Sequence, residues 1–138
     1  MYNSIDSKII DMLMGNARTP ISSMAKKLSV SKGTVRNRLI NLSRSRTIVG
    51  FKARVRFKQL GMEEVLVGFD IAPEHYMKAI GMLKKCDFIR EVYRTSGDHS
   101  AMALVIESES KVEDKLKDLE RIEGVRHVYP SFIQETVK

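Results

Sequence analysis

The chain has 138 residues, enough for one medium domain or two small ones, and 43% of them are hydrophobic, which excludes a disordered chain. No apolar run approaches the roughly 20 residues that a membrane-spanning helix needs, and charged residues interrupt the first apolar stretch, so we expect neither a membrane span nor a secretory signal. The single cysteine, Cys86, cannot form a disulfide within the chain, which fits a location in a reducing cytoplasm.

The net charge of +7 is divided unevenly along the chain. Residues 1–60 hold 13 Lys and Arg against only Asp6 and Asp11, a balance of +11. Residues 61–138 hold 11 Lys and Arg against 15 acidic residues, a balance of −4. This asymmetry predicts a basic module that meets a polyanion and a second module with a different role. The alternative is a basic face that is merely solvated.

The first predicted elements are two short amphipathic helices. One runs from Ser4 to about Met14, and the sequence Gly15-Asn16 is typical of a helix end. The second spans residues 20–28, with Thr19 expected as its N-cap and Pro20 at its first helical position. Their apolar stripes consist of Ile5, Ile9, Met12 and Leu13, and of Ile21, Met24, Ala25 and Leu28.

A third helix follows a tight turn at Ser29-Val30. Ser31 is its expected N-cap, and its buried stripe consists of Val35, Leu39 and Leu42. The opposite face presents Lys32, Gly33, Thr34, Arg36 and Asn37. Arg can form two hydrogen bonds with guanine, Asn can do so with adenine, and small residues allow close approach to the bases. The pattern predicts a helix-turn-helix whose last helix enters the major groove of double-stranded DNA.

Other cations near these helices suit DNA phosphates better than bases. We expect Lys26, Lys27, Arg38, Arg44 and Arg46 to anchor the protein without reading sequence, and we include Ser31 in the same interface. The alternative is a solvent-facing basic helix in an ordinary three-helix bundle.

Residues 47–57 alternate in the manner of β-strands, with a bend at Gly50. We interpret this stretch as a connector strand that leaves the DNA-binding domain, with a copy of the same strand from a second chain as one candidate partner. Lys58 to Gly61 ends it.

The acidic half has the element order strand–helix–strand–strand–helix–strand. The expected elements are strand 65–71, helix 73–85, strand 88–94, strand 101–106, helix 110–121 and strand 125–133. This βαββαβ order is that of a ferredoxin-like sandwich. Because that fold supports many functions, the order alone names none.

The whole chain resembles the Lrp/AsnC (feast/famine) family of transcription regulators. The matching stretches are Ile5-Asp6, Ile9-Ile10, Leu13, Asn16-Ala17-Arg18, Ala25-Lys26-Lys27-Leu28, Ser31 through Leu42, Ile48, Gly50-Phe51, Leu60-Gly61, Gly97-Asp98, Gly124-Val125 and Val137-Lys138. The resemblance implies a homodimer, often built further into an octamer, that binds pseudo-palindromic DNA and responds to a small-molecule effector.

We therefore expect an α+β protein with an N-terminal, winged-helix-like helix-turn-helix domain and a C-terminal ferredoxin-like βαββαβ domain. The expected boundaries are 1–50 for the DNA-binding domain, 51–63 for a hinge strand or linker, and 64–138 for the oligomerisation and effector domain.

The chain departs from the family at the implied effector site. The family usually has Gly-Asp-aromatic-Asp in this loop, whereas the sequence here reads Gly97-Asp98-His99-Ser100. The family's Thr-x-Thr of the last strand is replaced by Val128 and Pro130. Losing one carboxylate and two hydroxyls weakens the case for an ordinary amino acid, so we expect either a non-standard effector or none. His99 in this loop could bind a ligand or introduce pH dependence.

A second departure follows the third helix. Arg46 stands where the family usually has Gly, which implies a different exit of the chain or roughly 1 kcal/mol of backbone strain.

The sequence offers no catalytic or metal site. His75, His99 and His127 are too scattered to indicate a metal, and we expect no cofactor and no enzyme activity. Two alternatives remain open. One is an architectural DNA-binding protein with little base readout, and a remote one is an enzyme similar to the sirohaem decarboxylases, which share this two-domain build.

Overall fold

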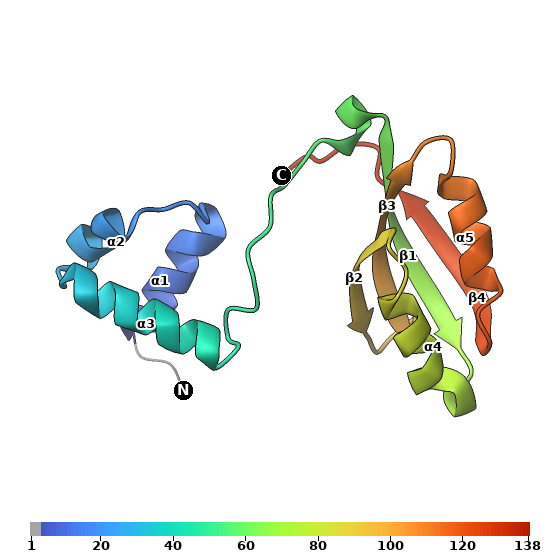
Figure 1. Cartoon of the computed structure of the whole chain (residues 1–138), viewed down its shortest axis with the longest axis horizontal. Helices are drawn as coiled ribbons and strands as arrows, with labels where there is room; N and C mark the ends of the chain where they lie inside the picture. The colour runs from blue at the N-terminus through green and yellow to red at the C-terminus, as the bar shows by residue number, and fades with distance from the viewer. Residues whose placement is uncertain (1–3) are drawn as a thin grey trace. The chain divides into compact units, whose positions relative to one another are not determined.

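The computed structural model describes residues 4–138, which form two compact units (Figure 1). The first unit extends to Arg54 and the second starts at Val55. The boundary falls within the segment 51–63 that we expected to be a linker.

The first unit contains three helices. These are α1 (Ser4–Gly15), α2 (Ile21–Leu28) and α3 (Lys32–Arg44). Its buried side chains are Ile9, Met24, Ala25, Val35 and Leu42. The remaining stripe residues, among them Leu13, Leu28 and Leu39, are partly buried against this core. The three predicted helices and their apolar stripes are therefore confirmed. Helices this short are stabilised mainly by packing one apolar face against the rest of the unit.

The expected start of α2 was wrong by one residue. Pro20 is the N-cap, with extended backbone (φ −66°, ψ 147°), and its carbonyl accepts hydrogen bonds from the amides of Ser23 and Met24. The Thr19 hydroxyl does not cap the helix, because it donates to the carbonyl of Asn16 at 2.6 Å and closes the preceding turn.

The predicted connector strand at 47–57 does not form within the single chain, and pairing with a second copy stays a prediction. Residues 45–56 contain no strand, and the next element is a short 3-10 helix, η1 (Phe57–Leu60). A strand needs a neighbour to accept and donate its backbone hydrogen bonds. None of the strands in residues 4–138 pairs with this segment, so its alternating sequence alone does not produce one.

The second unit is a four-stranded antiparallel sheet with helices on one face (Figure 1). In chain order its elements are β1 (Met62–Ile71), the 3-10 helix η2 (Pro73–His75), α4 (Tyr76–Lys84), β2 (Ile89–Arg94), β3 (Ala101–Ser108), α5 (Val112–Glu120) and β4 (Val125–Phe132). The strand order β2-β3-β1-β4 is that of the ferredoxin-like fold, and it confirms the predicted fold class. The helix expected from Pro73 is split, since its first three residues form η2.

Alternate residues of β1 point to opposite faces of the sheet. Val65, Val67 and Phe69 are fully buried against α4 and α5. Residues on the other face carry no helix, and Leu66, Tyr93 and Tyr129 are 45%, 52% and 44% exposed there. The sheet therefore has one face inside the core and one face without a helix, on which these large side chains are open in a single chain.

Candidate nucleic-acid interface

The turn between α2 and α3 fixes how the third helix begins. Ser29 has left-handed backbone (φ 54°), and the amides of Ser29 and Val30 donate to carbonyls in the last turn of α2. Ser31 Oγ accepts a hydrogen bond from the Thr34 amide at 3.0 Å, as expected for an N-cap. The hydroxyls of Ser31 and Thr34 also lie 2.8 Å apart and are hydrogen-bonded to each other.

One face of α3 is exposed along its first two turns. Lys32, Gly33, Arg36 and Asn37 are exposed, whereas Val35 between them is fully buried and points into the core. Thr34 is half-buried. The first two turns of α3 thus present Lys, Arg and Asn side chains around Gly33. The space beside this glycine is open, because an added Cβ would meet only Ser31 Oγ, at 3.8 Å. Such a surface can approach the edges of bases closely and offer them hydrogen-bond donors.

Further cations flank this face. Lys26 and Lys27 are exposed in the last turn of α2, and Arg44 is exposed in the last turn of α3. Long cationic side chains in such flanking positions suit the phosphates on either side of a groove.

Arg38 is engaged inside the unit. Its Nε donates to Oδ1 of Asp6 at 2.7 Å, and its Nη2 donates to Oδ2 at 2.5 Å. The Asp6 side chain is 1% exposed, and that of Arg38 is 31% exposed. These hydrogen bonds, more than the charge of Asp6, raise the pKa of Arg38 above its already high ordinary value. The guanidinium that we expected on a DNA phosphate joins α3 to α1.

The sequence carried a signal for this pair. Asp6 lies three residues before Ile9 and seven before Leu13, and therefore on the apolar stripe of α1. An acid in a buried stripe needs a cationic partner.

Arg46 keeps the left-handed backbone that the family's glycine provides. Its φ is 58°, and its amide donates to the carbonyl of Ser43 at 3.1 Å, while the amide of Thr47 donates to that of Leu42. We expected either a different path of the chain after α3 or a strained backbone at Arg46. The structure has the strained backbone.

In the loop before β3, two of the four expected effector residues are used within the protein. Ser100 Oγ donates to the carbonyl of Phe69 and accepts from the amide of Ile71, both at 3.1 Å. The His99 ring fills the space above Gly68, where a Cβ would lie 2.6 Å from His99 Cδ2. Gly97, with φ 108°, and Asp98 are exposed.

A cluster around Asp70 was not predicted. His99 Nδ1 lies 3.7 Å from one Asp70 oxygen, and His127 Nδ1 lies 3.8 Å from the other. Tyr129 donates to Asp70 at 3.1 Å, and its ring lies against His99 with centroids 4.9 Å apart. The cluster depends on the pairing of Asp70 with His127 between β1 and β4, a long-range register that no local pattern reveals.

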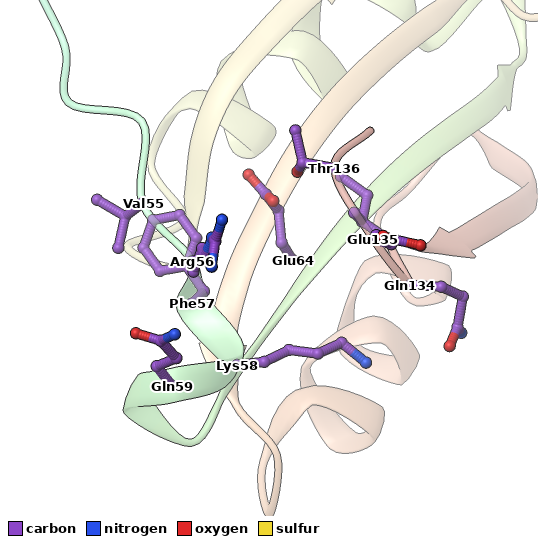
Figure 2. A pocket seen from close by; sticks show the side chains of 10 residues that line it. Val55, Arg56, Phe57, Lys58, Gln59, Glu64, Gln134, Glu135 and Thr136 are labelled. Atoms are coloured by element: carbon purple, nitrogen blue, oxygen red, sulfur yellow. The ribbon is translucent and has the colours of Figure 1, made fainter. Parts of the chain in front are cut away.

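A shallow cavity of about 350 Å³ lies in the second unit, beside the start of β1. Side chains from residues 55–59 line one side, residues 134–136 line the other, and Glu64 lies between them (Figure 2). Arg56 and Lys58 face a lining that also holds Glu64 and Glu135, so the cavity favours neither anions nor cations.

Within residues 4–138, no three His, Cys, Asp or Glu side chains are grouped so that they could hold a metal ion. Over the same residues, every helix is too short or too polar to cross a membrane.

Comparisons with known proteins agree with this geometry. A family model described as an AsnC-type helix-turn-helix domain matches residues 3–43. The chain is 35% identical over 141 residues to the HTH-type transcriptional regulator LrpA of Pyrococcus horikoshii, with 100% of both proteins covered. Among solved structures, E. coli AsnC is similar with a TM-score of 0.75 at 25% identity, over 100% of this chain and 95% of that one. The feast or famine regulatory protein Rv3291c of M. tuberculosis, solved with L-methionine, has a TM-score of 0.81 at 22% identity, over 99% and 94% of the two chains.

Proposed function

This chain belongs to the Lrp/AsnC family of transcriptional regulators, and from that membership we propose that two copies bind a pseudo-palindromic DNA site, each placing α3 in a major groove. The protein is a DNA-binding transcriptional regulator. Two-fold symmetry requires half-sites separated by about one helical turn or a multiple of it. A cytoplasmic location fits this partner.

The observation that supports this proposal most directly is the exposed face of α3. The opposite face of the helix is buried in the core, and this fixes which side chains point outward. We assign base contacts to Lys32, Gly33, Thr34, Arg36 and Asn37. Lys26 and Lys27 fit phosphate contacts, because they are exposed at the end of the helix that precedes the turn. Ser31 contributes as the cap of α3, and Arg38 contributes through Asp6 rather than through DNA.

The open sheet face supports self-association. Leu66, Tyr93 and Tyr129 stand exposed on it, and Leu66 is paired with Leu104 of β3 across the centre of the sheet. Covering such an apolar face with a second copy removes it from water. We propose a homodimer through this face, with higher oligomers such as octamers built from it.

For the effector, we propose that this chain does not take an ordinary amino acid at residues 97–100. Ser100 is already hydrogen-bonded to backbone on both sides, and the ring of His99 packs over Gly68. Val128 packs against the core, and Pro130 has no N–H to donate. The M. tuberculosis protein solved with L-methionine makes methionine the first ligand to test.

Selection of bound duplexes from random DNA tests the proposal. We expect an enriched site with two-fold symmetry, and an Arg36→Ala protein that loses the preference at one position of each half-site. Enrichment without any shared motif would instead support an architectural protein that binds mainly through backbone charge. Selections and calorimetric titrations with and without methionine and the other common amino acids test the effector. Saturable micromolar binding would contradict our proposal for residues 97–100.

A further inference from the structure

The segment after α3 carries a regular row of cations that the base-reading face leaves unexplained. Lys52, Arg54 and Arg56 alternate with Phe51, Ala53 and Val55, and all six residues are exposed. The segment has no helix or strand, and no acidic residue occurs between Asp11 and Glu63.

The spacing of this row suits a nucleic-acid backbone. In extended backbone, alternate side chains lie on opposite sides and recur about every 6.6 Å. Neighbouring phosphates on one strand of B-DNA lie 3.4 Å apart along the helix axis and, because the strand winds around that axis, roughly twice as far apart in space, so cations with this spacing match successive phosphates. The apolar residues then lie on the side away from the DNA.

The row also starts only a few residues after α3. The amides of Thr47 and Ile48 donate to the carbonyl of Leu42, and Ile48 packs against the core of the first unit. From Ile48, extended chain reaches at most about 14 Å to Lys52 and about 28 Å to Arg56. Both distances are shorter than one turn of the double helix, about 34 Å. Phosphates beside the groove that α3 enters are therefore within reach of the whole row.

We propose that Lys52, Arg54 and Arg56 form a second DNA contact, a row of cations that binds phosphates along one strand beside the groove occupied by α3. This inference rests on the proposed binding of α3 in the major groove. The row adds affinity for any sequence and carries no base preference.

The test is a variant with Lys52→Gln, Arg54→Gln and Arg56→Gln, measured in the full-length protein on its selected site and on random duplexes. We expect weaker binding to both by the same factor. We also expect the slope of log affinity against log salt concentration to fall in magnitude by about 0.9 for each lost contact, about 2.7 in all. The matched control removes three exposed cations of the second unit, with Lys84→Gln, Lys111→Gln and Lys117→Gln, and should leave the slope nearly unchanged.

A second measurement locates the contact. Ethylation of phosphates next to the α3 site should interfere with binding of the wild-type protein and no longer interfere with the triple variant. An unchanged salt slope together with an unchanged interference pattern would overturn the proposed row. Loss of slope in both triple variants alike would also overturn it, because net charge alone would then explain the effect. Absence of any DNA binding by the wild-type protein would instead refute the proposed function.

Discussion

Arg38 of α3 and Asp6 of α1 are joined by two parallel hydrogen bonds between a guanidinium and a fully buried carboxylate. The pair connects α3, whose exposed face we propose to read bases, to the first helix of the same unit. It therefore orients α3 relative to the core of the unit.

Replacing Asp6 should destabilise the first unit. We expect Asp6→Asn to lower the free energy of unfolding by about 2 kcal/mol, because hydrogen bonds to charged groups contribute roughly 1.5–3 kcal/mol. Arg38→Met should lower the free energy of unfolding by more than Asp6→Asn does, because it leaves the buried carboxylate of Asp6 without its guanidinium. Urea denaturation measures both, and Arg44→Met, at an exposed position of the same helix, is the control. Equal stability of Arg38→Met and Arg44→Met would contradict the role given to the pair.

Arg36 and Lys26 should have different effects on sequence preference. Arg36→Ala should cost about 1–3 kcal/mol at a single base pair of each half-site, and operators altered at that base pair should then bind as well as the original. Lys26→Ala should weaken binding to all operators by one common factor. Affinity measurements on a panel of operator variants distinguish the two. A uniform loss for Arg36→Ala would show that it is not a base reader.

The open face of the sheet should be sensitive to charge if it joins two copies. Leu66→Glu places a carboxylate in the proposed interface, so we expect the dimer to dissociate, as measured by sedimentation velocity. Met82→Glu on α4 is the control, because Met82 is exposed to nearly the same extent, 46% against 45%, on the helical side of the unit. Identical behaviour of the two variants would argue against this face.

Gly124 should tolerate a methyl group poorly. Its φ is 92°, and an added Cβ would lie 2.3 Å from Cβ of His75. We expect Gly124→Ala to cost about 2–4 kcal/mol, from left-handed backbone strain together with overpacking. Gly61, with φ 69° and no atom within 4 Å of the added Cβ, should cost only about 1 kcal/mol when replaced by Ala. Urea denaturation measures the free energy of unfolding of both variants. Equal losses for Gly124→Ala and Gly61→Ala would contradict this reasoning.

Tyr129 should ionise at unusually high pH. The hydrogen bond that it donates to Asp70, followed by burial and by the charge of that carboxylate, raises the pKa of Tyr129 above 10, its ordinary value. The raised pKa means that this hydrogen bond stabilises the fold below pH 10 and is lost as the pH rises through the raised value. Asp70→Asn should lower the pKa of Tyr129 toward the ordinary value. Absorbance titration of phenolate, compared with a Tyr129→Phe protein, isolates this group among the four tyrosines.

The first unit could be predicted from the sequence because its determinants are local. The Ser31 cap depends on residues three apart, and the buried stripe of α3 depends on spacings of three and four. The same reasoning placed Arg38 on the DNA side, because the helical pattern of α3 alone does not show that Asp6, 32 residues earlier, lies against it.

The second unit shows where such reasoning ends. The βαββαβ order followed from periodicity, but the grouping of Asp70, His99 and His127 follows from strand register, which shifts between Asp70 and Ile71 where β1 meets β4. The alternation at 47–57 shows a different limit. A period of two describes where side chains point and does not supply the neighbouring strand, which residues 4–138 of this single chain do not provide.

Pro130 has a consequence for whether further copies of the chain can add to the edge of the sheet. It lies in β4, the outermost strand on its side of the sheet, and pairs inward with Val67. A proline offers no N–H to a strand arriving from outside, so β4 is a poor template for lengthening the sheet strand by strand. Copies that pair face to face across a two-fold axis form closed particles, whereas copies that add head to tail at a strand edge form fibres without a defined end. The residue that removes a hydroxyl from the implied effector site thus also protects this edge against fibre growth.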